Sequence, residues 1–97
     1  YITAYVEPED INKDFQKIYE DYYAHEKLVK VLKKGTVPEI TNISGMPTCE
    51  IAVSVKKSSN KLIINAALDN LLKGAASQAV QCFNLMHDID EFHSLKY

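Results

Sequence analysis

The chain has 97 residues, of which 46% are hydrophobic and 25% are charged, and its formal net charge is −2 at pH 7. This size and composition fit one small globular domain, so we expect residues 1–97 to form a single domain, alone or within a larger protein. The weak negative charge argues against a nucleic acid or an acidic membrane as partner, and no apolar run is long enough to span a bilayer. The sequence has only two cysteines and no recognisable signal peptide, which favours a reducing compartment, the cytoplasm or an organelle.

The first half of the chain predicts three strands and one helix. Aromatic or β-branched residues alternate with small ones over residues 1–6, which predicts a strand. An acidic Glu-Pro-Glu-Asp segment then opens a helix that runs to about Tyr23. Its apolar stripe consists of Ile11, Phe15, Ile18, Tyr19 and Tyr22. Short strands are predicted at residues 28–32 and 39–44.

The second half predicts a β-hairpin followed by the main helix. Residues 49–55 alternate apolar with polar or small side chains, and residues 61–67 return after a Ser-Ser-Asn turn. Asp69 and Asn70 are good helix-capping residues in front of a long helix that ends near His87. One face of this helix is apolar at three- and four-residue steps: Leu72, Ala75, Ala76, Ala79, Val80, Phe83 and Met86.

This order predicts an α+β fold, with an antiparallel or mixed sheet and the two main helices on one face. The strand at residues 62–67 is fairly apolar on both sides, as Leu62, Ile64 and Ala66 alternate with Ile63, Asn65 and Ala67. Because two helices can cover only one face, we expect the other face to contact a partner, most simply a second copy of the chain.

The start of the main helix is the candidate binding site. Gly74 lies inside the helix, where glycine costs about 1 kcal/mol relative to alanine, so we expect a strand or a ligand to approach its backbone closely. The free amides of such a start suit an anion, and Lys73 would add a positive charge. The alternative reading of Asn70, Lys73 and Gly74 is a cap, a solvated lysine and tight helix–strand packing.

Other reactive side chains have simpler interpretations. Cys49 has no histidine or aspartate placed nearby in the sequence to activate it, so we expect a buried structural thiol, and we expect the same of Cys82 on the flank of the main helix. The six-residue spacing of His87 and His93 differs from the four-residue spacing of helical zinc sites, so we assign no metal ligand. Tyr19, Tyr22 and Tyr23 are interpreted as core or interface residues rather than a stacking site, and no residue pair indicates a reaction.

The stretch from Leu68 to Met86 resembles the last long helix of N-acetyl-gamma-glutamyl-phosphate reductases, the NADPH-dependent enzymes of arginine biosynthesis. It shares their Asp-Asn-Leu-x-Lys-Gly-Ala core and the continuations Gln-Ala-Val-Gln and Asn-Leu-Met. Aspartate-semialdehyde dehydrogenases share that core more loosely. Upstream, the chain is collinear with the family at residues 22–31, at Gly35-x-x-Pro38, at Gly45 and at residues 49–51. It departs from the family pattern at Ser77, where glycine is usual, and at Met46-Pro47, where Ser/Thr-Asn is usual.

The resemblance implies the C-terminal, subunit-contacting segment of a larger reductase, with the α+β fold of the semialdehyde dehydrogenase type. The family's dinucleotide-binding domain, catalytic cysteine and catalytic histidine would precede Tyr1, so no residue here is assigned a catalytic role and the isolated segment is expected to be inactive. NADP would be bound mainly by that preceding domain. By resemblance, Asn70 would contact the nicotinamide end of the cofactor, with Lys73 and Gly74 as further candidates. The whole enzyme would take a small-molecule acyl phosphate and form a homo-oligomer through this sheet.

Two alternatives stay open. The chain could be a stand-alone self-association domain without chemistry, or a segment of the related aminoadipyl-phosphate reductase of lysine biosynthesis. The coding sequence upstream of Tyr1 separates the first alternative from the reductase. The acyl-chain pocket lies outside this segment, so the substrate stays open.

Overall fold

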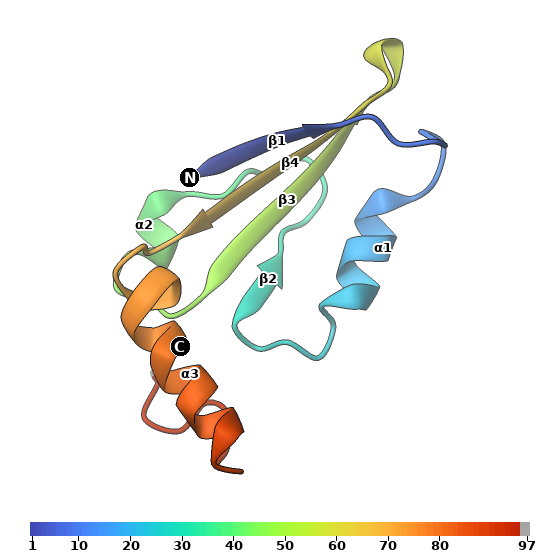
Figure 1. The fold of residues 1–97 in the computed structure, drawn as a ribbon. Coiled ribbons are helices and arrows are strands. Elements are labelled where there is room, and N and C mark those ends of the chain that lie inside the picture. Colours follow the sequence, from blue (N-terminus) through green and yellow to red (C-terminus); the bar gives the residue numbers. More distant parts are fainter. Residues whose placement is uncertain (96–97) are drawn as a thin grey trace.

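A four-stranded mixed sheet forms the centre of the computed structural model, which describes residues 1–95 (Figure 1). The strands are β1 (Ile2–Val6), β2 (Val29–Val31), β3 (Cys49–Lys56) and β4 (Lys61–Leu68), and their order in the sheet is β1-β4-β3-β2. β4 pairs antiparallel with both β1 and β3, whereas β2 pairs parallel with β3. β1 and β2 are therefore the edges of the sheet.

The predicted hairpin is the longest paired element. β3 and β4 are joined by η1 (Lys57–Ser59) and by Asn60, which has a φ of 53°. Asparagine tolerates this left-handed conformation better than most residues, so the Ser-Ser-Asn turn suits the tight return. The register pairs Val55 with Leu62 and Val53 with Ile64, so these four apolar side chains share one face of the sheet.

Four helical segments flank the sheet: α1 (Phe15–Tyr22), α2 (Ile40–Ile43), the π-helix η2 (Leu72–Ala76) and α3 (Ser77–Met86). α1 begins later than expected because Asp14 caps it, its carboxylate accepting a hydrogen bond from the Lys17 amide at 3.1 Å. The predicted strand at residues 39–44 is wrong. One helical turn forms there instead and buries Ile43, which is 3% exposed, so tertiary packing overrides the β-branched composition.

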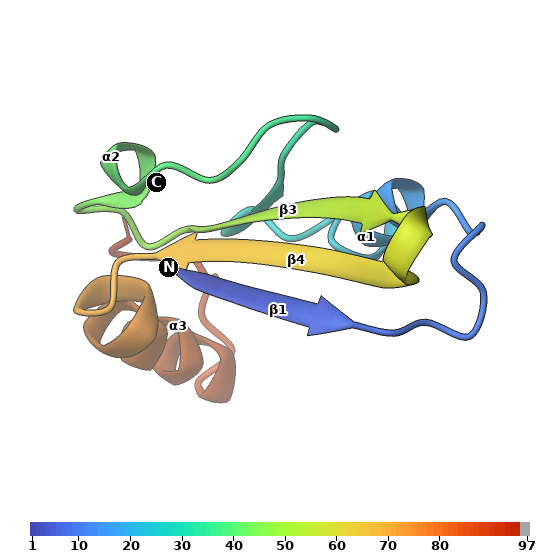
Figure 2. The ribbon, with the colours of Figure 1, turned by 90° about the horizontal axis from the view of Figure 1, so that it is seen from above.

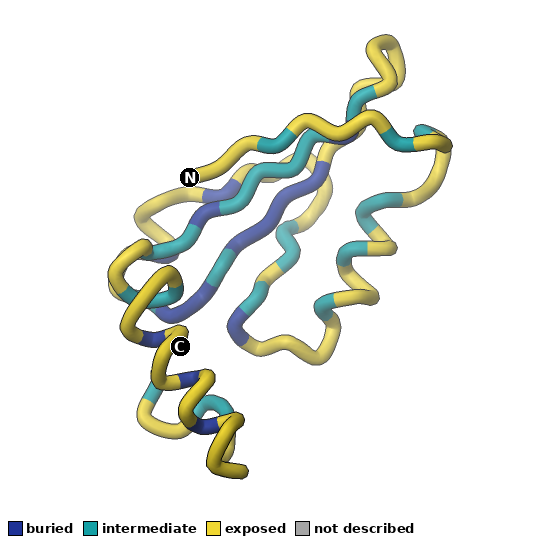
Figure 3. The backbone as a smooth tube through the Cα atoms, viewed as in Figure 1, coloured by how far each residue is buried: buried dark blue, intermediate teal, exposed yellow. Residues whose placement is uncertain are grey.

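The core lies between the sheet and the segments around it. Its buried apolar residues are Leu28, Ile43, Ile51, Ala52, Val53, Leu62 and Ala67. α1 packs against β3, and α2 packs against the end of β4. Figure 3 shows that β3 holds the longest continuous run of buried residues, from Glu50 to Val53, whereas β1 and α3 are largely exposed.

The predicted α+β class with a mixed sheet is confirmed. In the view of Figure 2, α1 and α3 both lie on the far side of the sheet. Of these two helices, α1 packs on a strand, β3, whereas α3 continues η2 and extends past the end of the sheet (Figures 1 and 2). No helix within residues 1–95 is long and apolar enough to cross a membrane.

Candidate cofactor-contacting site

Asp69 organises the junction at which β4 leads into η2. Its carboxylate accepts hydrogen bonds from the amides of Leu71 at 2.9 Å and Leu72 at 3.2 Å, as expected of a helix cap. It also accepts a third bond, at 2.9 Å, from the amide of Gly45 in the loop after α2. The bonds from Gly45 and Leu71 hold the pKa of Asp69 below its ordinary value. One charged side chain thus connects the helix start to a loop 24 residues earlier in the chain.

The same bonds correct the expectation that this helix start offers its free amides to an anion. Asp69 itself occupies the amides of Leu71 and Leu72. Its backbone carbonyl accepts the Gly74 amide at 3.1 Å. Because the chain supplies its own carboxylate here, these three donors are not available to a bound anion.

Asn70 and Gly74 meet across the π-helix. The amide of Gly74 bonds the carbonyl of Asp69, and that of Ala76 bonds the carbonyl of Leu71 at 3.0 Å, which is the five-residue spacing of a π-helix. Such turns are rare and frequently mark functional sites. The close approach predicted at Gly74 is present, but the approaching group is the Asn70 side chain. A methyl group at Gly74 would lie 2.8 Å from Oδ1 of Asn70.

The side chain of Lys73 is part of a polar network with α3 and the segment after it. Its ammonium group donates to Oε1 of Gln81 at 2.9 Å, and Nε2 of Gln81 donates to the carboxylate of Glu91. Asn84 donates to the backbone carbonyls of Glu91 at 3.0 Å and His93 at 2.9 Å. Lys73 is therefore half-buried and hydrogen-bonded, not a freely solvated lysine. The network attaches the segment after α3 to the helix.

The two cysteines differ in their surroundings. Cys49 is half-buried at the start of β3, and burial raises the pKa of its thiol, an effect that the nearby ammonium group of Lys73 partly offsets. A raised pKa keeps the group protonated and unreactive at neutral pH, as a structural thiol requires. Cys82 corrects the expectation of a structural thiol, because its side chain is exposed on α3.

The prediction of which face of α3 is buried is wrong: the polar face is buried and the apolar face is exposed. Its buried residues are the polar Ser77, Gln81 and Asn84, at 6%, 8% and 3% exposure. The predicted apolar face is exposed, with Phe83 at 55% and Met86 at 80%. The spacing of four and three residues between the buried polar side chains was the signal in the sequence for this face.

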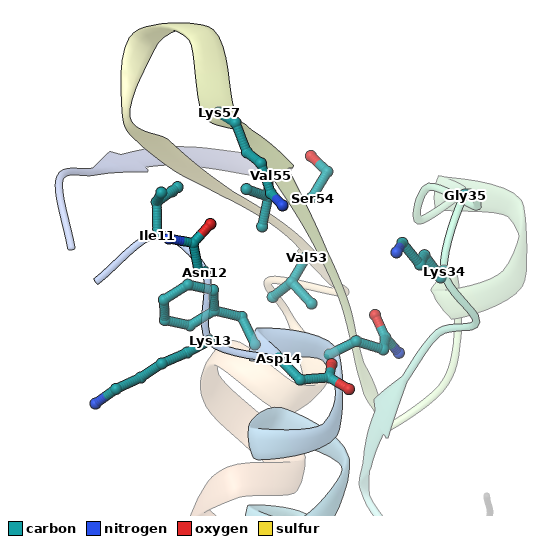
Figure 4. Close-up of a pocket in the computed structure, with 12 residues that line it drawn as sticks. Ile11, Asn12, Lys13, Asp14, Lys34, Gly35, Val53, Ser54, Val55 and Lys57 are labelled. Carbon is teal, nitrogen blue, oxygen red and sulfur yellow. The ribbon is translucent and has the colours of Figure 1, made fainter. Parts of the chain in front are cut away.

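A hollow lies between the start of α1 and the C-terminal end of β3. Figure 4 shows Val53 and Val55 projecting from β3 into it, with Lys34 and Lys57 nearby. Its volume is about 660 Å³, and the residues that line it include no histidine or cysteine. The hollow is therefore a crevice of mixed polar and apolar lining, in which Lys13, Lys34 and Lys57 outnumber the single carboxylate of Asp14.

The histidines near the C-terminus and the tyrosines of the first helix form neither a metal site nor a ligand-stacking site. Within residues 1–95, no three histidine, cysteine, aspartate or glutamate side chains are grouped to hold a metal ion. His87 instead contacts the Phe83 ring, with centroids 4.3 Å apart. Tyr22 and Tyr23 contact edge to face at 4.9 Å, and Tyr22 is 78% exposed. The tyrosines therefore form a partly exposed cluster at the surface and do not belong to the core.

Comparison with known proteins identifies the fold. Residues 1–70 match the family described as semialdehyde dehydrogenase, dimerisation domain. The chain belongs to this family. The matched residues include all four strands and Asn70, and they end before Lys73 and Gly74.

Individual relatives of this dimerisation domain extend the similarity through α3. The N-acetyl-gamma-glutamyl-phosphate reductase of Thermoanaerobacter pseudethanolicus is 46% identical over 82 residues, which cover 84% of the chain and 24% of that protein. The enzyme of the same name from Acinetobacter baylyi is 45% identical over 91 residues, or 92% of the chain and 26% of that protein. The one from Acinetobacter baumannii is 44% identical over 96 residues, or 97% of the chain and 27% of that protein. The chain thus spans about a quarter of the length of these relatives.

Proposed function

We propose that this chain is the dimerisation segment of an N-acetyl-gamma-glutamyl-phosphate reductase, an enzyme that reduces an acyl phosphate to a semialdehyde in arginine biosynthesis. The observation that carries the proposal is the identity of 44–46% to reductases of that name over 84–97% of the chain. A cytoplasmic location, and NADPH as the hydride donor, belong to the same proposal.

The outward face of α3 supports a place within a longer protein. Phe83 is 55% exposed and Met86 80%, while the helix turns polar residues toward its own chain. An apolar face of this kind is a favourable docking surface for another part of the same protein. The relatives are about three and a half times as long as the chain, so they have further residues that could occupy this face.

The fit of a dinucleotide cofactor depends on Asn70. Its side chain is exposed and lies over the π-helix, and a carboxamide offers both donors and an acceptor, which match the carboxamide of nicotinamide. NADPH supplies the hydride when it is bound. In this proposal Asn70 orients the nicotinamide end, Gly74 borders the same surface, and Lys73 adds positive charge nearby through an ammonium group held by Gln81.

Self-association through the sheet is the second part of the proposal. The family description names a dimerisation domain, and the edge strand β1 exposes Ile2 at 63% and Tyr5 at 69%. β1 pairs with β4 on one side only, and large apolar side chains on such an edge strand favour contact with another chain. Sedimentation velocity over a range of concentrations should detect a dimer that Tyr5→Lys weakens. A monomer at every concentration would contradict this part.

The catalytic proposal is tested with two proteins side by side. The 97-residue chain and the longer protein that contains it are assayed for phosphate-dependent oxidation of the semialdehyde with NADP. We expect activity only from the longer protein, because burial raises the pKa of the Cys49 thiol and so disfavours the thiolate that a nucleophile requires. Activity of the 97 residues alone would overturn the assignment, as would an upstream coding sequence without a glycine-rich strand–helix motif.

A further inference from the structure

Gly74 is placed where only glycine leaves room for the Asn70 side chain. A methyl group at this position would lie 2.8 Å from Oδ1 of Asn70, closer than such atoms approach without one of them moving. The next nearest group, Cδ1 of Leu68, would be 3.4 Å away, which is an ordinary contact. Asn70 is therefore the one close obstacle to a side chain at this position.

Neither the backbone nor the fold requires glycine here. Gly74 is exposed and lacks the left-handed φ seen at Gly35 and Gly45. Alanine would favour the helical conformation by about 1 kcal/mol. Asn70 is also exposed, so its carboxamide could rotate away from an added methyl at little cost in stability. What the methyl would change is the position of the carboxamide.

The backbone around the pair is held, so it offers no other way to relieve the contact. The Asp69 carbonyl accepts the Gly74 amide at 3.1 Å, which sets the spacing between residues 69 and 74. The Asp69 carboxylate bonds Leu71 and also Gly45 in a distant loop. Residue 70 lies between these anchors, so a methyl group at Gly74 must act on the Asn70 side chain.

We propose that Gly74 is a positioning residue, which holds the Asn70 carboxamide in the orientation that receives the nicotinamide end of the cofactor. This inference rests on the proposed cofactor contact of Asn70 and names the device that orients it. Gly74→Ala should raise the KM for NADPH about three- to tenfold, the loss expected for one neutral hydrogen bond. The KM for the acyl phosphate should not change, and thermal stability should stay equal or rise.

The experiment is a double-mutant cycle in the full-length protein, with Gly74→Ala, Asn70→Ala and the double variant. KM for each substrate, kcat and the melting temperature are measured for each. Because Gly74 acts through Asn70, the double variant should have the same KM for NADPH as Asn70→Ala alone. Ala75→Gly is the matched control, since it changes the same π-helix by one methyl group in the opposite sense. It should lower the melting temperature and leave the KM for NADPH unchanged.

The outcomes separate this inference from the proposal on which it rests. If Asn70→Ala raises the KM for NADPH and Gly74→Ala does not, the positioning role is wrong and the cofactor contact stands. If the two effects add in the double variant, Gly74 acts by another route and the inference is overturned. If Asn70→Ala leaves the KM for NADPH unchanged, the cofactor contact fails and the inference fails with it.

Discussion

Gln81 offers a sharp test of the polar network behind the candidate site. Its carboxamide links Lys73 to Glu91, because it accepts a hydrogen bond from the ammonium group at 2.9 Å and donates one to the carboxylate. The residue is 8% exposed, although glutamine is usually found at the surface. Gln81→Ala removes both hydrogen bonds at once. Gln78→Ala makes the same chemical change on the exposed side of the same helix, so it is a matched control.

The size of the effect follows from the partners. Each hydrogen bond to a charged group contributes about 1.5–3 kcal/mol, so complete loss of both would cost about 3–6 kcal/mol. Lys73 and Glu91 are half-buried, and water can replace part of what they lose. We therefore expect Gln81→Ala to lower the free energy of unfolding by about 1–3 kcal/mol, or about 5- to 150-fold in the folding equilibrium. Gln78→Ala should stay within about 0.5 kcal/mol of the parent.

Equilibrium unfolding in urea, followed by circular dichroism, measures both variants. The midpoints should separate while the slopes stay equal, which would show that stability changed and the surface exposed on unfolding did not. Equal losses in the two variants would refute the reasoning, because the effect would then come from the helix and not from the network.

Three further predictions address the core, the junction and the thiols. Leu62 is 4% exposed, and Leu62→Ala should lower the free energy of unfolding by about 2–5 kcal/mol. Val55, its partner across the hairpin, is 39% exposed, and Val55→Ala should cost less than about 1 kcal/mol. Thermal unfolding that ranks the two variants the other way would contradict the assigned core. Folding lowers the pKa of Asp69, so its contribution to stability is present above the unfolded pKa and is lost as the pH falls through the folded pKa. The difference in unfolding free energy between the parent and Asp69→Asn should therefore shrink below about pH 4 in an acid titration. A difference that stays constant with pH would argue against this role. Alkylation with iodoacetamide, read by mass spectrometry, should modify the exposed Cys82 before the half-buried Cys49, whose pKa is raised; the reverse order would show that Cys49 is more accessible or more ionised than described.

Local patterns predicted the elements that depend on neighbouring residues. The hairpin of β3 and β4 was predicted because alternation and the Ser-Ser-Asn turn act over a few residues. The capping role of Asp69 was predicted for the same reason, since its partners lie two and three residues away. The bond from Gly45 to Asp69 was not predictable, because the two residues meet only after the sheet has formed.

The candidate site was predicted in position but not in arrangement. Asn70, Lys73 and Gly74 do lie at one helix start, and the close approach at Gly74 was expected. The sequence could not tell that this start is a π-helix, a five-residue spacing that shifts Lys73 toward Gln81 and places Asn70 over Gly74. Their roles toward a cofactor stay predictions.

By itself, the sequence determined the α+β class, the strand pairing of the hairpin and the family, because residue alternation, turn chemistry and a long shared motif are all written along the chain. Only the tertiary structure decided which face of each element is buried. A helical pattern such as that of α3 shows two faces but not which one meets the protein, and here the polar face of Gln81 and Asn84 packs inward on the chain's own hydrogen-bonding groups. The apolar face with Phe83 is left for a surface that these residues do not supply.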